Sequence, residues 1–122
     1  MKTIDKHLLS YNKTGQSIIV SFQSTNRLSI INSSKIEDEL LQLIISGETS
    51  ILLDFSAIKF IDSSSFRALL SVHIDAKLNE VEFVILNPNN EVVELINLVD
   101  LDNIFNIRYT SDSNYKEFKN AS

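Results

Sequence analysis

The apolar segment Ile51-Leu52-Leu53-Asp54-Phe55 limits the fold of this chain more than any other part of the sequence. Strands that are covered on both faces, as parallel strands usually are, appear in sequences as short continuous apolar runs of this kind. Sheets with one solvated face instead alternate apolar and polar residues. We therefore predict a buried central strand.

Shorter elements precede this strand. The runs from Ile4 to Leu9 and from Ile18 to Phe22 predict two strands of a hairpin. They are separated by Asn12-Lys13-Thr14-Gly15, where the glycine can supply the positive φ of a turn. A first helix is indicated by Ser34-Lys35-Ile36-Glu37, which has the form of a capping box. The helix is expected to end at Gly47.

Elements of both kinds also follow the central strand. The segment Asp62-Ser63-Ser64-Ser65 supplies capping side chains before apolar residues at helical spacing from Phe66 to Leu78. Val81 to Leu86 predicts another strand. Asn87-Pro88 has the form of an N-cap followed by a proline at the first helical position, and the last strand is expected from Ile104 to Tyr109.

The predicted order is ββαβαβαβ. Its alternating second half implies parallel strands joined by right-handed helical crossovers. The fold class is α/β, an open mixed β-sheet packed with α-helices. Ligands and partners of such sheets meet loops at the carboxyl ends of the strands, where we expect Asp62 to Ser65.

The chain has the size of one domain. It has 122 residues, of which 43% are hydrophobic, and only two glycines and one proline, so nothing resembles an inter-domain linker. We assign residues 1–109 to a single domain. Residues 110–122 are rich in Ser, Asn and Lys and are predicted to be a polar C-terminal tail that adds little to the fold.

Charge and composition exclude several classes of function. The formal net charge is −5 and the 11 Lys and Arg residues are scattered, which argues against nucleic acid or an anionic membrane as partner. No apolar run approaches the roughly 20 residues of a spanning helix. Without cysteine there is no disulfide and no thiolate metal site. We expect a cytoplasmic protein with no metal and no cofactor.

Two short strings resemble motifs of penicillin-recognising serine enzymes. They are S-x-x-K at Ser56-Ala57-Ile58-Lys59 and K-T-G at Lys13-Thr14-Gly15. Their order along the chain is wrong for those enzymes and the chain is too short for their fold. The sequence also has no G-x-S-x-G elbow, no phosphate-binding glycine loop and no H-E-x-x-H. We therefore assign no catalytic residue and do not expect an enzyme.

The remaining side chains that could support chemistry are few. His7 and His73 are the only histidines, and His73 lies on the apolar side of its predicted helix, where a partly buried structural imidazole is expected. Asp54 and Asp62 end or follow apolar strands. They are expected to cap nearby N–H groups, and a paired-carboxylate site is the less favoured alternative.

The segment from Asp54 to Ser64 resembles the signature of the STAS domain family. In that signature a strand of the type L-D-L-S is followed by an apolar pair and then by D-S-S/T-G-L at a helix start. Asn87-Pro88 is similar to the S-P helix start of the family, and Leu98 to Ile104 is similar to its short loop before the last strand. The resemblance covers most of the chain from Ile51 to Tyr109.

This resemblance implies a protein-binding switch like a bacterial anti-sigma factor antagonist. Ser63 matches the serine that partner kinases phosphorylate in such proteins, with Ser64 as the second choice. The unphosphorylated form would capture an anti-sigma factor with serine kinase activity, and phosphorylation would end the capture. A phosphate at a helix start also meets free N–H groups, whereas Asp62 would repel it. The implied partner surface comprises Asp62, Ser63, Ser64, Ser65, Phe66 and Arg67.

The sequence departs from the family pattern at two places, and other functions stay open. Ser65 replaces the glycine of the family, and its side chain is expected to obstruct the close approach of a partner. Ser24-Thr25-Asn26-Arg27-Leu28 stands where the family often has G-E-L-D. The alternatives are a constitutive interaction or scaffold module whose serines only cap a helix, and an accessory domain that binds a small molecule or lipid.

Overall fold

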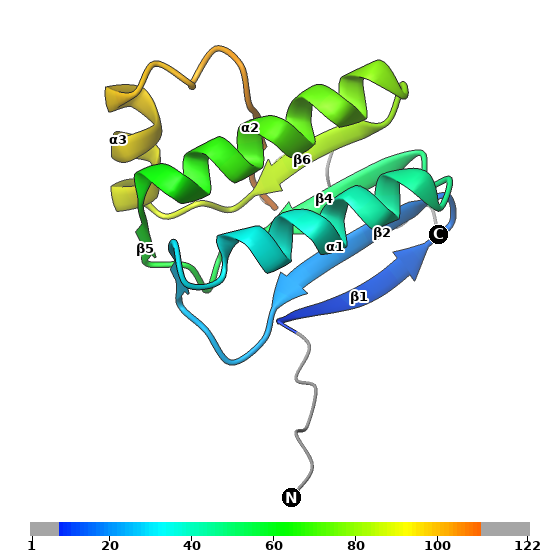
Figure 1. Cartoon of the computed structure of the whole chain (residues 1–122), viewed down its shortest axis with the longest axis horizontal. Helices are drawn as coiled ribbons and strands as arrows, with labels where there is room; N and C mark the ends of the chain where they lie inside the picture. Colours follow the sequence, from blue (N-terminus) through cyan, green and yellow to red (C-terminus); the bar gives the residue numbers. More distant parts are fainter. Residues whose placement is uncertain (1–7, 111–122) are drawn as a thin grey trace, which may run out of the picture.

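The central strand lies in the middle of a five-stranded mixed sheet in the computed structural model, which describes residues 8–110 (Figure 1). Strand β4 (Ser50–Asp54) is parallel to both of its neighbours, β2 (Ser17–Phe22) and β6 (Glu82–Leu86). At the edges, β1 (Leu9–Thr14) pairs antiparallel with β2, and β7 (Asn106–Arg108) pairs parallel with β6. The predicted α/β class with an open mixed sheet is confirmed.

The N-terminal hairpin is present, but its first strand is shifted along the chain. β1 begins at Leu9 and runs through Asn12 to Thr14, residues predicted to form the turn. The turn is confined to Gly15 and Gln16, and Gly15 has a φ of 63°. Polar residues are tolerated in β1 because it is an edge strand with a largely exposed surface. The predicted strand from Ile4 lies mainly outside the described residues.

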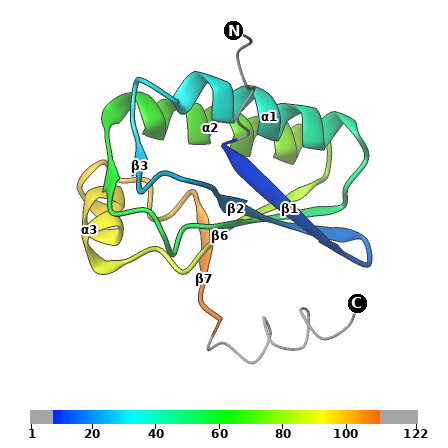
Figure 2. The ribbon, with the colours of Figure 1, turned by 90° about the horizontal axis from the view of Figure 1, so that it is seen from below.

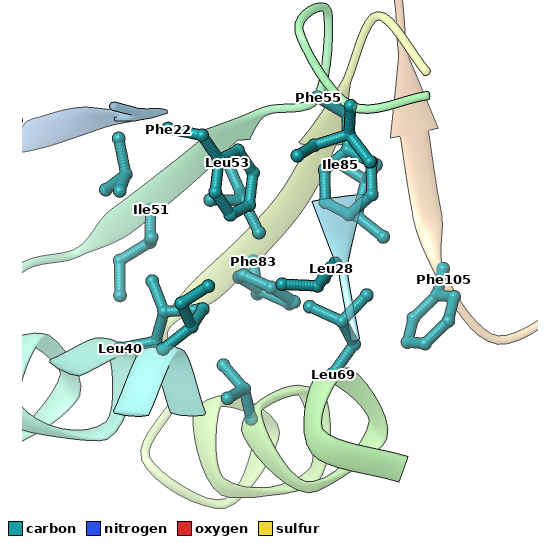
Figure 3. Close-up of a cluster of buried hydrophobic side chains, with 14 of the residues drawn as sticks. Phe22, Leu28, Leu40, Ile51, Leu53, Phe55, Leu69, Phe83, Ile85 and Phe105 are labelled. Carbon is teal, nitrogen blue, oxygen red and sulfur yellow. The ribbon is translucent and has the colours of Figure 1, made fainter. Parts of the chain in front are cut away.

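Three helices complete the fold. Helices α1 (Ser33–Ile45) and α2 (Ser63–Leu78) pack side by side on one face of the sheet, and α3 (Asn90–Leu98) lies beside its end (Figure 2). Side chains of α1 and α2, such as Leu40 and Leu69, point toward the sheet in the main core (Figure 3). The ring of Phe22 meets that of Phe55 edge to face at 5.5 Å, and other labelled members of this core are Leu53, Phe83, Ile85 and Phe105.

Two helix starts differ from the prediction. Helix α1 follows Asn32 without a side-chain cap, and Ser34 lies inside it, so the predicted capping box is wrong. The Asn32 amide is engaged elsewhere, accepting from the Ser29 N–H at 2.9 Å and donating to the Arg27 carbonyl at 2.9 Å. The end of α1 before Gly47, which has a φ of 97°, is confirmed.

The cap of α3 is Asn89 rather than Asn87. The Asn89 side-chain oxygen accepts from the Val92 N–H at 2.9 Å, and its amide donates to the Ile58 carbonyl at 2.8 Å. Pro88 therefore precedes the cap. Asn87 adopts a φ of 56°, a left-handed conformation that asparagine tolerates better than most residues.

Two very short strands, β3 (Arg27–Leu28) and β5 (Phe60–Ile61), pair in parallel as a second small sheet. Neither was predicted as a strand, because runs of two residues carry no periodicity. They bring the segment before α1 next to the segment before α2, and this contact positions the site described below.

The C-terminal tail predicted for residues 110–122 lies outside the described residues except for Thr110. Among residues 8–110, none of the helices is both long and apolar enough to cross a membrane.

Core packing predicts that two leucine substitutions differ strongly in their effect on the free energy of unfolding. Leu53 is fully buried in β4 and Leu78 is 78% exposed at the end of α2. Leu53→Ala should lower the free energy of unfolding by about 2–5 kcal/mol, because it leaves a cavity. The matched control Leu78→Ala should change it by less than about 0.5 kcal/mol. Urea unfolding checks both values, and equal losses would contradict the described core.

Candidate functional site

The candidate site lies at the start of α2, directly after the small sheet. β5 ends at Ile61, and Asp62 follows as the N-cap in extended conformation, with φ −115° and ψ −179°. The Asp62 N–H donates to the Leu28 carbonyl at 3.2 Å, which continues the pairing of β3 with β5. The expected position at the carboxyl side of the central strands is confirmed, because β4 leads through a turn and β5 into α2.

The Asp62 carboxylate accepts four hydrogen bonds. Its Oδ1 accepts from the Ser64 hydroxyl at 2.8 Å, from the Ser65 hydroxyl at 3.0 Å and from the Ser65 N–H at 3.1 Å. Its Oδ2 accepts from the Ile30 N–H at 3.0 Å, in the loop between β3 and α1. One side chain therefore caps α2 and also fixes the neighbouring loop.

These hydrogen bonds determine the charge state of Asp62. Partial burial of the carboxyl group raises its pKa, but the bonds from Ser64, Ser65 and Ile30 stabilise the ionised form and together outweigh burial. The pKa of Asp62 is therefore held below its usual range, and the group is a carboxylate at neutral pH.

The three serines after Asp62 have different environments. The hydroxyls of Ser64 and Ser65 donate to Asp62, Ser64 being half-buried and Ser65 fully buried. Ser63 is exposed at the first position of α2, and its hydroxyl makes no hydrogen bond within residues 8–110. Among the three, Ser63 is the hydroxyl that an outside enzyme could reach without breaking a contact of the fold.

Two side chains of the predicted partner surface face inward. Ser65 is 0% exposed and Phe66 is 7% exposed, in the main core. The expectation that the Ser65 side chain obstructs a partner is therefore wrong, because that side chain points at Asp62 beneath the surface. Ser63 and Arg67 are exposed, and Asp62 and Ser64 are half-buried.

Sequence reasoning missed the apolar residues beside this helix start. In the loop held by Asp62, Ile30 is 74% exposed and Ile31 is 92% exposed. Nearby in the small sheet, Phe60 is 42% exposed and lies 4.9 Å under the Arg27 guanidinium. Ile30 and Ile31 are adjacent isoleucines before a predicted helix, and this pair was the sequence signal for an apolar surface. Their orientation, however, depends on the Asp62 contact.

The sequence also suggested a paired-carboxylate site and two strings that resemble serine-enzyme motifs, and the structure gives their residues separate roles or places. Asp54 accepts from the Ser56 N–H at 3.0 Å and so caps its own turn, while Asp62 caps α2. Thr14 and Gly15 of the K-T-G string lie at the hairpin turn, near the amino end of β4, whereas Ser56 follows its carboxyl end. Within residues 8–110, His, Asp and Glu side chains form no group of three that could hold a metal.

His73 has a structural environment, as expected. Its ring lies edge to face against Phe105, with 6.0 Å between ring centroids. Burial lowers the pKa of His73, and the charge of Lys77 lowers it further. The imidazole is therefore favoured in its neutral form. His7 lies outside the described residues.

Comparisons with known proteins agree with this fold. The family model described as the STAS domain matches residues 10–114. A crystal structure from Thermotoga maritima, described as a candidate anti-sigma factor antagonist, is 23% identical with a TM-score of 0.77, covering 93% of this chain and 96% of that one. A STAS domain protein from Planctomyces limnophilus is 17% identical with a TM-score of 0.77, covering 92% and 97%. The phosphorylated form of the Bacillus cell fate determinant SpoIIAA is 15% identical with a TM-score of 0.67, covering 90% and 97%.

The lowered pKa of Asp62 predicts a pH-dependent contribution to stability. A carboxyl group whose pKa is lower in the folded chain stabilises the fold at pH values above its unfolded pKa, about 3.9. The contribution is lost as the pH falls through the folded pKa. Asp62→Asn keeps an oxygen that can cap α2 but removes the negative charge at the positive end of the helix dipole, and it should lower the free energy of unfolding at pH 7 by about 0.3–1 kcal/mol.

Urea unfolding of both proteins from pH 7 down to about pH 3 checks this prediction. The difference in the free energy of unfolding should shrink as the pH falls below the ordinary pKa of aspartate. A difference that stays constant over this range would contradict the role of the Asp62 charge.

Proposed function

The chain belongs to the STAS domain family, and from this premise we propose that it is a protein-binding regulatory switch resembling an anti-sigma factor antagonist. Its partner is an anti-sigma factor with serine kinase activity, which the unphosphorylated chain captures in the cytoplasm. Phosphorylation of Ser63 by that kinase ends the capture. The chain itself catalyses no reaction, and any nucleotide belongs to the partner.

The accessibility of the Ser63 hydroxyl is the observation that carries this proposal. A kinase must bring the hydroxyl within reach of a bound nucleotide, and Ser63 is exposed with no hydrogen bond to lose within residues 8–110. The hydroxyls of Ser64 and Ser65 are instead bonded to Asp62. Ser64, the second choice, would have to leave that bond first.

A phosphate on Ser63 would act on binding more than on the fold. It adds about −1.5 to −2 charges at pH 7. The positive end of the α2 dipole favours this charge, and the Asp62 carboxylate opposes it. These local effects offset each other, but a partner seated on the same surface would have to desolvate the new charge.

The surface that we propose for the partner combines one switch residue with apolar and cationic anchors. Ser63 and Arg67 lie one helical turn apart on α2 and are both exposed. Ile30 and Ile31 lie in the loop bonded to Asp62. Arginine is enriched among the residues that contribute most to protein–protein binding, and exposed apolar patches mark binding surfaces.

The second candidate function is a constitutive STAS interaction module without phosphorylation. One observation favours it. Arg27 lies over Phe60 on the exposed side of the small sheet, at a place where the family pattern often has an acidic residue nearby. A cation in place of an anion favours a partner of different charge from the kinases that the family pattern implies.

Substitutions of Ser63 distinguish the two candidates. Ser63→Asp should weaken binding to the kinase-type anti-sigma factor of the same host by about 2–5 kcal/mol, because it places an unpaired charge in the contact. Ser63→Ala should bind as the wild type does and should take up no phosphate when the kinase and ATP are supplied. Titration calorimetry and site mapping by mass spectrometry measure both effects.

Ser64→Ala is the matched control for the switch. It removes the neighbouring hydroxyl, and phosphate should still appear on Ser63. Equal affinity of the wild type, Ser63→Ala and Ser63→Asp, with no phosphate on Ser63, would refute the switch and leave the constitutive module.

A charge placed on the apolar loop tests the extent of the binding surface. Ile31→Glu should weaken binding to the same partner by about 2 kcal/mol or more, because the carboxylate would be buried at the contact. Ile45→Glu is the matched control, since Ile45 is 74% exposed at the far end of α1. The two variants should have similar melting temperatures. Equal affinities of the two variants would place the contact elsewhere.

A further inference from the structure

The outer surface of α1 and α2 has a groove at the end far from Ser63. The two helices run side by side in the same direction, because each joins two parallel strands of the sheet (Figure 1). α2 has 16 residues from Ser63 to Leu78, so its two ends are about 22 Å apart. Between the C-terminal halves of the helices lies a groove of about 380 Å³, lined by Leu41, Ser71, Ile74, Asp75 and Leu78.

Apolar side chains form the walls of this groove on both helices. Ile74 and Leu78 are exposed one turn apart on α2. Leu41 contributes from α1, where it is half-buried, and the exposed Ile45 follows it one turn later. Single exposed apolar residues are ordinary on a protein surface. Apolar side chains that gather around one groove instead mark a place where another molecule binds.

The charge of the groove is negative. Asp75 is the one charged residue among the described residues that line it, and its carboxylate makes no hydrogen bond or ion pair within residues 8–110. Asp38 is exposed three residues before Leu41, on the same side of α1, and its carboxylate is equally free within this range. Lys77, the basic residue in the last turn of α2, lines a different hollow together with His73. The last turn of α1 has no basic residue.

An amphipathic helix with basic residues matches both the shape and the charge of the groove. In helix-in-groove recognition, such a helix lays apolar side chains spaced by three and four residues between two walls. A Lys or Arg at its rim then meets the free Asp75 carboxylate. A second copy of this chain fits less well, because two chains of net charge −5 repel each other. An apolar small molecule would bury Asp75 without a partner, which is costly.

We propose that the groove between α1 and α2 binds a basic amphipathic helix of a protein partner, with apolar side chains against Ile74 and Leu78 and a Lys or Arg paired with Asp75. This second docking surface goes beyond the function proposed at Ser63 and does not depend on it. Because the groove lies at the opposite end of α2, a partner can stay bound there while Ser63 meets its own partner. The domain then joins two proteins, and a change at Ser63 releases only one of them.

A synthetic helix can test the groove directly. The probe is a fluorescein-labelled peptide of about 14 residues, made of leucine and lysine with the leucines on one helical face, and fluorescence anisotropy measures its Kd for the full chain. Ile74→Gln with Leu78→Gln should raise the Kd at least about tenfold, because it removes the apolar walls while keeping residues that favour a helix. Asp75→Asn should raise the Kd about threefold and reduce its dependence on salt.

Matched controls show whether binding is specific to this groove. Leu98→Gln changes an exposed leucine that lies beside Glu94 on α3 and should leave the Kd within about twofold. Ser63→Asp should also leave it within about twofold, which separates the groove from the switch. A peptide with glutamate in place of every lysine should bind at least about tenfold more weakly.

Three results would overturn the proposal. The first is a Kd that stays within about twofold when Ile74 and Leu78 are both replaced by glutamine. The second is equal affinity for the lysine and glutamate peptides. The third is a dimer in sedimentation velocity that the same two substitutions dissociate, because a second copy would then occupy the groove. If the doubly substituted chain fails to fold by circular dichroism, Leu78→Gln alone is measured in the same way.

Discussion

Strand β4 is apolar on both of its faces, and the rest of the structure follows from that constraint. Ile51 and Leu53 need the layer formed by α1 and α2, while Leu52 belongs to a second apolar cluster. Neighbouring strands are required at both edges, since the strand must pair its backbone N–H and C=O groups away from water. Both neighbours, β2 and β6, are parallel to it. The crossover helices that parallel strands need are the same helices that fill the main core.

The parallel arrangement also determines where chemistry or binding can occur. The chain leaves β4 at its carboxyl end, makes a turn capped by Asp54 and enters α2 through the small sheet of β3 and β5. Asp62 is the residue at which these segments meet. Its carboxylate bonds to two segments that are far apart in the sequence, so the loop with Ile30 and the first turn of α2 form one surface.

Within four consecutive residues, this arrangement separates side chains that hold the helix start from one that is exposed. Asp62 and Ser65 are engaged in holding the helix start, and Ser65 is fully buried. Ser63, between them, is exposed and contributes no hydrogen bond within residues 8–110. A change at Ser63 can therefore alter what a partner meets while the bonds of Asp62 remain in place. The same separation would serve a constitutive binding module.

The sequence by itself determined the order of the elements in residues 8–110, apart from the two-residue strands β3 and β5, and the position of the candidate site. The apolar run at Ile51 defined a buried strand, and Asp62 defined a helix start, because both signals are local. The tertiary structure alone decided which asparagine caps α3, since Asn89 is chosen by its bond to the distant Ile58 carbonyl. It likewise decided that Ser65 faces inward and that the Ile30 loop joins the site. The outcomes at Asn89 and Ile30 depend on hydrogen bonds between residues far apart in the chain, and no periodicity in a single sequence records such contacts.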